Sequence, residues 1–125
     1  MTQIINRFTG KVITEGDMNL RELVLYYVKT EREAGRRPYL SYSYLRGSDL
    51  SDSDLSYSNL SDSDLRGSNL RGSNLSYSDL RGSDLRYSNL RGSNLSYSDL
   101  SYSNLSGSDL SGSDLSGVKI GQEEK

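Results

Sequence analysis

The chain has no cysteine and no histidine among its 125 residues, and these two absences exclude several kinds of site at once. Without cysteine there can be no disulfide framework, no thiol chemistry and no zinc-ribbon spacing. Without histidine the chain lacks the usual general base and the commonest metal ligand, so a Ser-His-Asp triad is impossible. Hydrophobic residues make up only 33% of the chain, which is too few for an ordinary packed globule.

Neither positive nor negative charge is in large excess, since the formal net charge is only −2. Residues 1–37 carry seven basic and five acidic side chains, while residues 38–117 carry six arginines and ten aspartates. This distribution fits neither a basic nucleic-acid binder nor a strongly acidic decoy. The first sixteen residues, MTQIINRFTGKVITEG, lack the long apolar run of a signal peptide or a membrane span. We therefore expect a cytoplasmic protein with no membrane partner.

A five-residue word is repeated through most of the chain. Leucine occupies every fifth position between residues 40 and 115, sixteen times in succession, and Ile120 continues the phase. The residue two places before leucine is serine in fifteen successive words, and the residue directly before it is almost always Asp or Asn. The first position after leucine is Ser or Arg, and the second is Tyr, Gly or Asp. A fixed short period of this kind indicates a repeat architecture.

The spacing of five fits neither standard element. Successive leucines would lie about 140° apart around an α-helix, and an odd spacing would alternate them between the two faces of a flat strand. A backbone that turns once per word instead points every leucine inward, and the serine two places earlier also points inward. Coils built this way are stable only when stacked, which predicts a solenoid. The predicted core is Leu40, Leu45, Leu50, Leu55, Leu60, Leu65, Leu70, Leu75, Leu80, Leu85, Leu90, Leu95, Leu100, Leu105, Leu110, Leu115 and Ile120.

The word S-(D/N)-L-(S/R)-X resembles the pentapeptide repeat proteins, whose consensus is A-(D/N)-L-X-X, over residues 38–120. The resemblance implies an all-β solenoid, a right-handed quadrilateral β-helix of about four coils with four words per coil. The residues alone leave three or four words open. The two variable positions agree in 12 of 24 comparisons at a lag of 20 residues and in 10 of 26 at a lag of 15.

The inward serines depart from the family, whose inward position is usually alanine or another small residue. A buried hydroxyl without a partner costs about 1–3 kcal/mol, although serine often bonds to a nearby backbone carbonyl. We therefore expect the fold to form but to be less stable than an alanine counterpart.

The first 37 residues differ from the repeats and predict an N-terminal cap. Two extended runs flank Thr9-Gly10, as in a hairpin. A helix over about residues 20–34 is indicated by Asn19 with Glu22 three places later, which form a capping box, and by Gly35 as a stop. The hairpin and helix resemble N-terminal segments of phage and bacterial pentapeptide repeat proteins. The predicted domains are thus a cap (1–37), a β-helix (38–120) and a charged tail (121–125) that covers little, so the last coil is a candidate for self-association.

With twenty residues per coil, three surface rows become candidate binding surfaces. Tyr57, Tyr77 and Tyr97 stack on one face, as an aromatic ladder for sugars, bases or ice, or simply as packing that stiffens the sheet. On a second face Arg66 and Arg86 stack with Arg46, and on the next Arg71 stacks with Arg91, with Arg81 nearby. These arginines form either an anion-binding patch or a surface neutralised by neighbouring aspartates, and neutralisation is the favoured interpretation.

Catalysis has little support in the sequence. The aspartates before leucine are repeated and solvated, and no glycine-rich loop precedes a helix. Asp49, Asp52 and Asp54 place three carboxylates within six residues, but solvated turn aspartates are the favoured interpretation over a weak calcium site. No catalytic, cofactor-binding or metal-binding residue is predicted.

Three functions remain as hypotheses. The near-uniform words favour a non-enzymatic structural scaffold, a designed or consensus-like array whose role is its fold. The resemblance offers a second hypothesis, a DNA-mimicking binder of a type II topoisomerase such as gyrase, although four coils are short and carry six arginines. A generic protein-interaction module is the third.

Overall fold

A computed structural model describes residues 2–7 and 9–120. The chain begins with an antiparallel hairpin of β1 (Thr2–Ile5) and β2 (Val12–Gly16), with Gly10 in the connecting turn at a φ of 75°. The hairpin lies where the Thr9-Gly10 signal predicts it. The charged tail predicted for residues 121–125 lies outside the described residues.

The helix α1 (Leu20–Glu33) has a defined cap at each end. At the start, the Asn19 side chain accepts the Glu22 backbone N–H at 2.8 Å, and the Glu22 carboxylate accepts the Asn19 N–H at 3.2 Å. At the end, Gly35 and Arg36 donate their N–H groups to carbonyls of the last helical turn, which is a Schellman motif. The buried face of the helix consists of Leu23, Val24 and Val28.

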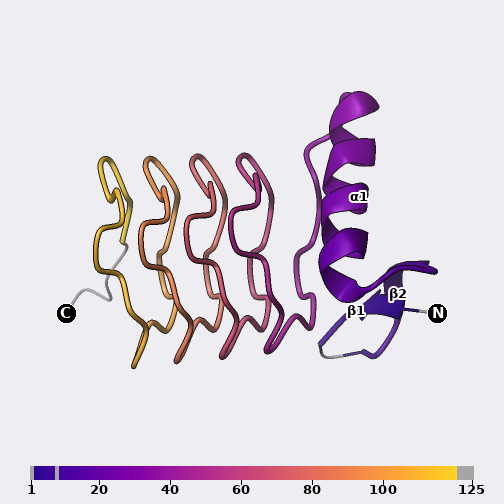
Figure 1. Cartoon of the computed structure of the whole chain (residues 1–125), viewed down its shortest axis with the longest axis horizontal. Helices are drawn as coiled ribbons and strands as arrows, with labels where there is room; N and C mark the ends of the chain where they lie inside the picture. Colours follow the sequence, from indigo (N-terminus) through magenta and orange to yellow (C-terminus); the bar gives the residue numbers. More distant parts are fainter. Residues whose placement is uncertain (1, 8, 121–125) are drawn as a thin grey trace.

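Stacked coils make up the rest of the described chain (Figure 1). Parallel bridges join residues twenty apart, from Tyr39 with Asn59 to Asp99 with Lys119. In one such step the Leu70 N–H donates to the Asn89 carbonyl at 2.7 Å, and the Asn89 N–H donates to the carbonyl of the serine two places before Leu70 at 2.9 Å. One coil is therefore twenty residues long and contains four words rather than three.

The inward leucines form one continuous core with the N-terminal elements. Every leucine of the repeat from Leu40 to Leu100 is at most 2% exposed. Ile4 and the buried face of α1 belong to the same cluster. Figure 1 shows α1 lying across the end of the stack, with the hairpin beside it. The hairpin also pairs with the first coil, because the Tyr44 N–H donates to the Ile5 carbonyl at 2.8 Å.

The prediction that all seventeen in-phase residues are core is wrong at the C-terminal end. Leu105 and Leu110 are only half-buried, Leu115 is 45% exposed and Ile120 is 54% exposed. The reason is positional, since each coil is covered by the next one and no coil follows the last within the described residues.

The inward serines from Ser43 to Ser98 are buried, those of the last three words are half-buried, and most of their hydroxyls are bonded to the backbone. Ser68 Oγ, for example, donates at 2.7 Å to the carbonyl of Leu65 in the same turn. Three hydroxyls have no partner, those of Ser43, Ser48 and Ser58. The premise that the serine row weakens the core therefore holds only at those three positions. The same-turn bonds are made by Ser53, Ser63, Ser68, Ser73, Ser83, Ser88, Ser93, Ser98, Ser103, Ser108 and Ser113, and Ser78 bonds instead to the Leu55 carbonyl.

Candidate functional site

The coils turn at corners whose outward residues form rows along the stack. In each corner the second residue after leucine has a positive φ, and in most corners the following serine donates its N–H to the leucine carbonyl. Type II turns have such a residue at their third position, and glycine suits it best. Here half of these residues are glycines, whereas tyrosines or aspartates fill the other half at φ values of 54–64°. The predicted tyrosine and arginine surfaces lie on these outward rows.

The structure brings the three predicted tyrosines together in one such row. The rings of Tyr57 and Tyr77 stack at 4.9 Å between centroids and 2° between planes, and those of Tyr77 and Tyr97 at 5.1 Å and 12°. The row ends where the ring of Tyr97 lies over Gly117, whose missing side chain would otherwise meet it. Stacking covers the ring faces, so the row presents ring edges and hydroxyls to solvent.

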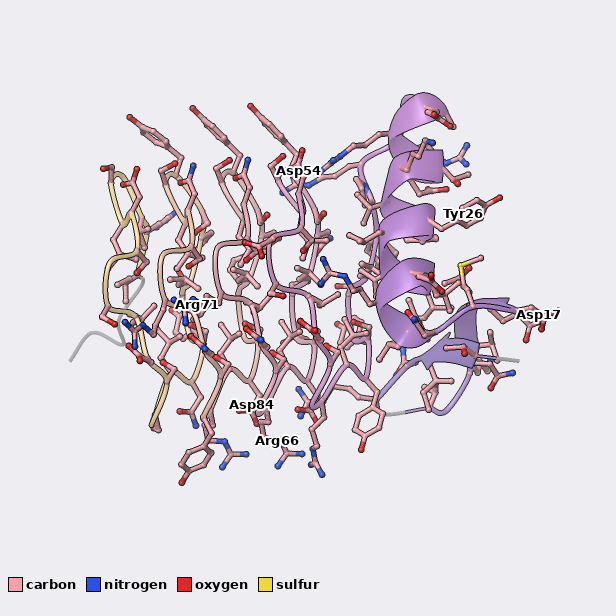
Figure 2. The ribbon with its side chains drawn as sticks, viewed as in Figure 1. Asp17, Tyr26, Asp54, Arg66, Arg71 and Asp84 are labelled. Atoms are coloured by element: carbon pink, nitrogen blue, oxygen red, sulfur yellow. The ribbon has the colours of Figure 1, made fainter. Side chains whose placement is uncertain are left out.

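The row of Arg46, Arg66 and Arg86 alternates with aspartates instead of forming an open cationic patch. Arg66 donates to the Asp64 carboxylate at 2.8 and 2.9 Å and lies 3.5 Å from the carboxylate of Asp84 one coil later. Arg86 pairs with Asp84 in the same bidentate way, with a closest distance of 2.7 Å. Figure 2 shows Arg66 and Asp84 at the same edge of the coils. This geometry supports neutralisation on this face.

Burial acts differently on the two aspartates of that row. The Asp64 side chain is only 3% exposed, and its burial raises the pKa of the carboxyl above the ordinary value, although Arg7 and Arg46 oppose the shift. Hydrogen bonds from Arg86 lower the pKa of Asp84, against a smaller effect of burial. Both carboxyl groups lie within ion-pair distance of the arginines beside them.

Arg71 and Arg91 lie on the next face, where asparagines replace the paired aspartates. Their backbone N–H groups donate to Asn69 and Asn89, both at 3.0 Å. The guanidinium of Arg91 lies 3.9 Å from the Asp109 carboxylate. This face is the less neutralised of the two arginine rows. Arg81, on another face, pairs with Asp79 at 2.7 Å.

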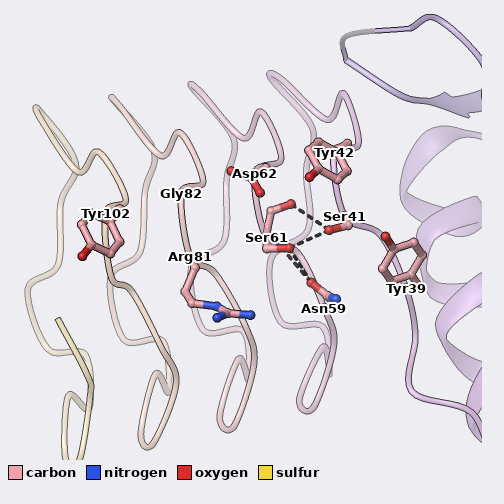
Figure 3. A pocket seen from close by; sticks show the side chains of 9 residues that line it. All are labelled: Tyr39, Ser41, Tyr42, Asn59, Ser61, Asp62, Arg81, Gly82 and Tyr102. Carbon is pink, nitrogen blue, oxygen red and sulfur yellow. Dashed lines mark hydrogen bonds between the residues drawn. The ribbon is translucent and has the colours of Figure 1, made fainter. Parts of the chain in front are cut away.

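A pocket that the sequence analysis did not anticipate lies on the face of Arg81 (Figure 3). It has a volume of about 540 Å³. The Asp62 carboxylate lies against Gly82, in the position that a side chain at Gly82 would take. The pocket contains hydroxyls, aromatic rings, a guanidinium and a carboxylate. It is lined by Tyr39, Ser41, Tyr42, Asn59, Ser61, Asp62, Arg81, Gly82 and Tyr102.

One feature of the sequence could have indicated this pocket. Its corner row reads Tyr42, Asp62, Gly82, Tyr102, so a glycine interrupts large residues at twenty-residue spacing. Comparing corner positions at that spacing would have found the gap once the coil length was known.

The three clustered aspartates of the first words do not converge. Asp49 accepts hydrogen bonds from Ser51 and lies 3.6 Å from Arg21, and Asp54 accepts from Ser56 and lies 3.4 Å from Arg32. Within residues 2–7 and 9–120, no group of three or more acidic side chains is placed to hold a metal ion. In the same part of the chain, no helix combines the length and the apolar character needed to cross a bilayer.

A coil of four five-residue words with inward leucines defines a quadrilateral β-helix built from pentapeptides. The family model described as pentapeptide repeats matches the chain at residues 39–72, 63–100 and 73–112, in eight copies. The matches together span more than half of the sequence. The chain belongs to the pentapeptide repeat family, whose members form right-handed quadrilateral β-helices.

Solved structures of this family resemble the chain to different degrees. Rfr23 from the cyanobacterium Cyanothece 51142 is 31% identical with a TM-score of 0.68, over 69% of this chain and 58% of that one. The chain thus spans less than two thirds of the length of Rfr23. The pentapeptide repeat protein alr5209 from Nostoc is 26% identical with a TM-score of 0.41, over 78% of this chain and 95% of that one. QnrB1, a plasmid-mediated fluoroquinolone resistance protein, is 25% identical with a TM-score of 0.37, over 70% of this chain and 50% of that one. No curated protein matches the chain.

Proposed function

We propose that the chain is a non-enzymatic structural scaffold, a consensus-like β-helical rod of about four coils, closed at one end by the hairpin and α1. Its role is to hold side chains in fixed rows at the spacing of its coils. The proposal rests on one observation, that the repeated word satisfies most of its own polar groups. Most inward serines bond to their own turns, and Arg66, Arg81 and Arg86 each bond to the aspartate two places earlier in the same word.

The surface chemistry supports a scaffold over a reaction site. The arginine row carries its counter-charges within the same coils, so an incoming anion would have to displace Asp64 and Asp84. Bidentate guanidinium–carboxylate pairs are among the stronger hydrogen-bonded pairs in proteins, which makes this displacement unfavourable. The serine hydroxyls of the pocket are bonded to neighbours, since Ser41 and Ser61 share a hydrogen bond and the Ser61 hydroxyl donates to Asn59.

The same arginines argue against the DNA-mimic hypothesis. A mimic of DNA needs a continuous negative surface like a row of phosphates. On the face of Arg46, Arg66 and Arg86, positive and negative side chains alternate from coil to coil. A type II topoisomerase would therefore meet a mixed surface.

A supercoiling assay with gyrase tests the proposal. We expect the chain to cause no change in supercoiling. QnrB1, a fluoroquinolone resistance protein of the family, is assayed at the same concentrations as the reference sample. A double variant, Arg66→Ser with Arg86→Ser, leaves Asp64 and Asp84 against Arg46 alone on this face, so two carboxylates outnumber one guanidinium without any change at the corner positions. If the unmodified chain inhibits the enzyme or protects it from a quinolone, the scaffold proposal is wrong.

A pull-down with the immobilised chain addresses the interaction-module hypothesis. The scaffold predicts that no protein is retained in proportion to the chain. The matched control replaces Tyr57, Tyr77 and Tyr97 with serine, which removes the aromatic row and leaves the core unchanged. A protein retained by the unsubstituted chain and lost from this control would establish an interaction function instead.

A further inference from the structure

The stacked tyrosines hold three phenol rings in register on adjacent coils. Tyr77 lies in the middle, with centroids 4.9 Å from Tyr57 and 5.1 Å from Tyr97. The near-parallel planes align the ring carbons next to the hydroxyl, the ortho carbons, with those of the neighbouring ring. These are the carbons at which oxidised phenols couple.

The rings are also accessible to small reagents. Tyr57 is 56% exposed, Tyr77 45% and Tyr97 58%, so solvent reaches the edge of every ring. Each ring is attached at a corner of the coil and projects outward, which leaves its side-chain torsions free of core packing. Rotation about these torsions can therefore bring two ortho carbons together.

We propose that this tyrosine row is an oxidative cross-linking site, at which one-electron oxidants join adjacent coils through dityrosine. Each of two neighbouring phenols loses one electron and its hydroxyl proton to give a phenoxyl radical. The radicals couple by a bond between two ortho carbons, and the two ring hydrogens then move to the oxygens to restore both phenols. The net change is the loss of two electrons and two protons, the electrons being taken up by a persulfate that is reduced to two sulfates.

Proximity favours coupling within one chain over coupling between chains. A ring held about 5 Å from its partner corresponds to a local concentration on the order of 1 M, whereas a dilute sample supplies other chains at micromolar concentration. Tyr87 provides the contrast, because the corner positions one coil before and after it are Gly67 and Gly107. Its ring lies over Gly107 and not over another phenol.

The experiment uses the full chain at micromolar concentration with a ruthenium tris-bipyridyl photosensitiser and persulfate. Dityrosine fluorescence can be read directly because the chain has no tryptophan. Trypsin separates the three rings, since cleavage after the repeat arginines and Lys119 places Tyr57 on residues 47–66, Tyr77 on 72–81 and Tyr97 on 92–119. We expect monomers two hydrogens lighter, in which peptide 72–81 is joined to one of the other two.

Conservative variants separate this proposal from general oxidation. Tyr77→Phe keeps the ring stack but removes the phenol shared by both pairs, so the intramolecular product should fall about tenfold or more. Tyr87→Phe removes one phenol outside the row and should leave the yield unchanged. The proposal is overturned if Tyr77→Phe retains the product, if Tyr87→Phe loses it, or if the natural chain yields only cross-links between chains.

Discussion

The inward serine shows how one side chain can stabilise or destabilise the coil at different positions of the same repeat. At Ser68 the leucine carbonyl accepts both the serine N–H, at 3.1 Å, and its hydroxyl, at 2.7 Å. At Ser58 the N–H bond is present at 3.3 Å, but the buried hydroxyl has no partner. An intramolecular hydrogen bond contributes about 1 kcal/mol net, whereas an unpaired buried polar group costs about 1–3 kcal/mol. Alanine should therefore have opposite effects at the two positions.

Ser58→Ala should raise the free energy of unfolding by about 1 kcal/mol, because it removes a buried hydroxyl that bonds to nothing. Ser68→Ala should lower the free energy of unfolding by about 0.5–1 kcal/mol, because it removes a hydroxyl that forms a hydrogen bond. Urea denaturation at equilibrium measures both changes. Equal signs for the two variants would show that the distinction between paired and unpaired hydroxyls has no energetic weight.

The sequence predicts the direction of these residues but not their bonding. Inward leucines and serines follow from the period of five. The lack of a partner for the Ser58 hydroxyl cannot be derived from the word in which it lies. Ser88 also follows a tyrosine, and yet its hydroxyl donates to the Leu85 carbonyl at 2.7 Å. The Leu55 carbonyl, which corresponds to the acceptor used in the other words, accepts the hydroxyl of Ser78 from the next coil at 3.0 Å. The exposure of Leu115 also depends on what lies beyond its coil and not on its own word.

The coil, as an element, owes part of its stability to arginine–aspartate rows that run from one coil to the next. Asp84 links two coils, since it accepts from Arg86 in its own word and lies 3.5 Å from Arg66 in the previous coil. The length of the coil and hence these rows could not be derived from the residues, because lags of 15 and 20 residues agree almost equally well. The resemblance to the family supplied the choice, and the twenty-residue bridges agree with it.

Asp84→Asn should lower stability at neutral pH by about 1 kcal/mol and have little effect in acid. The pKa of Asp84 is lowered in the folded chain, so its carboxylate stabilises the fold above the unfolded pKa near 4. That contribution is lost as the pH falls through the lowered folded value. Urea denaturation of both chains between pH 7 and pH 2 measures the difference.

Asp64→Asn is the matched control, because burial raises the pKa of Asp64 instead of lowering it. Protonation of Asp64 favours the fold as the pH falls. The difference in stability between Asp64→Asn and the unsubstituted chain should therefore change with pH in the direction opposite to that for Asp84→Asn. Parallel pH profiles for the two variants would contradict the assignment of the two carboxyls.

At the scale of the whole molecule, the two ends of the stack differ. Figure 1 shows α1 and the hairpin across one end, and Ile4 and Leu23 there are at most 1% exposed. At the other end Leu115 and Ile120 remain exposed. Stacked repeats need their terminal units covered, since an open coil edge presents both leucines and unpaired backbone groups.

Deleting residues 1–37 should cause the chain to aggregate. The deletion exposes the leucines of the first coil and the backbone groups that bond to β1 in the intact chain. Light scattering and far-ultraviolet circular dichroism measure the outcome. A matched control, Asn19→Ala, weakens the helix start by about 1 kcal/mol and should leave the chain monomeric. A truncated chain that stays monomeric and keeps its β-type spectrum would show that the N-terminal segment is dispensable.

The twenty-residue register also restricts how a gene for this protein can change in length. Removing one word between Arg66 and Tyr77 would shift the later residues by a quarter of a coil relative to the earlier ones, so Arg66 would no longer face Asp84 and Tyr57 would no longer stack on Tyr77. Removing or duplicating twenty codons returns each side chain to the same edge one coil away. Viable insertions and deletions within the repeats should therefore occur in whole-coil steps, and recombination between misaligned copies would lengthen or shorten the rod without rewriting its surface.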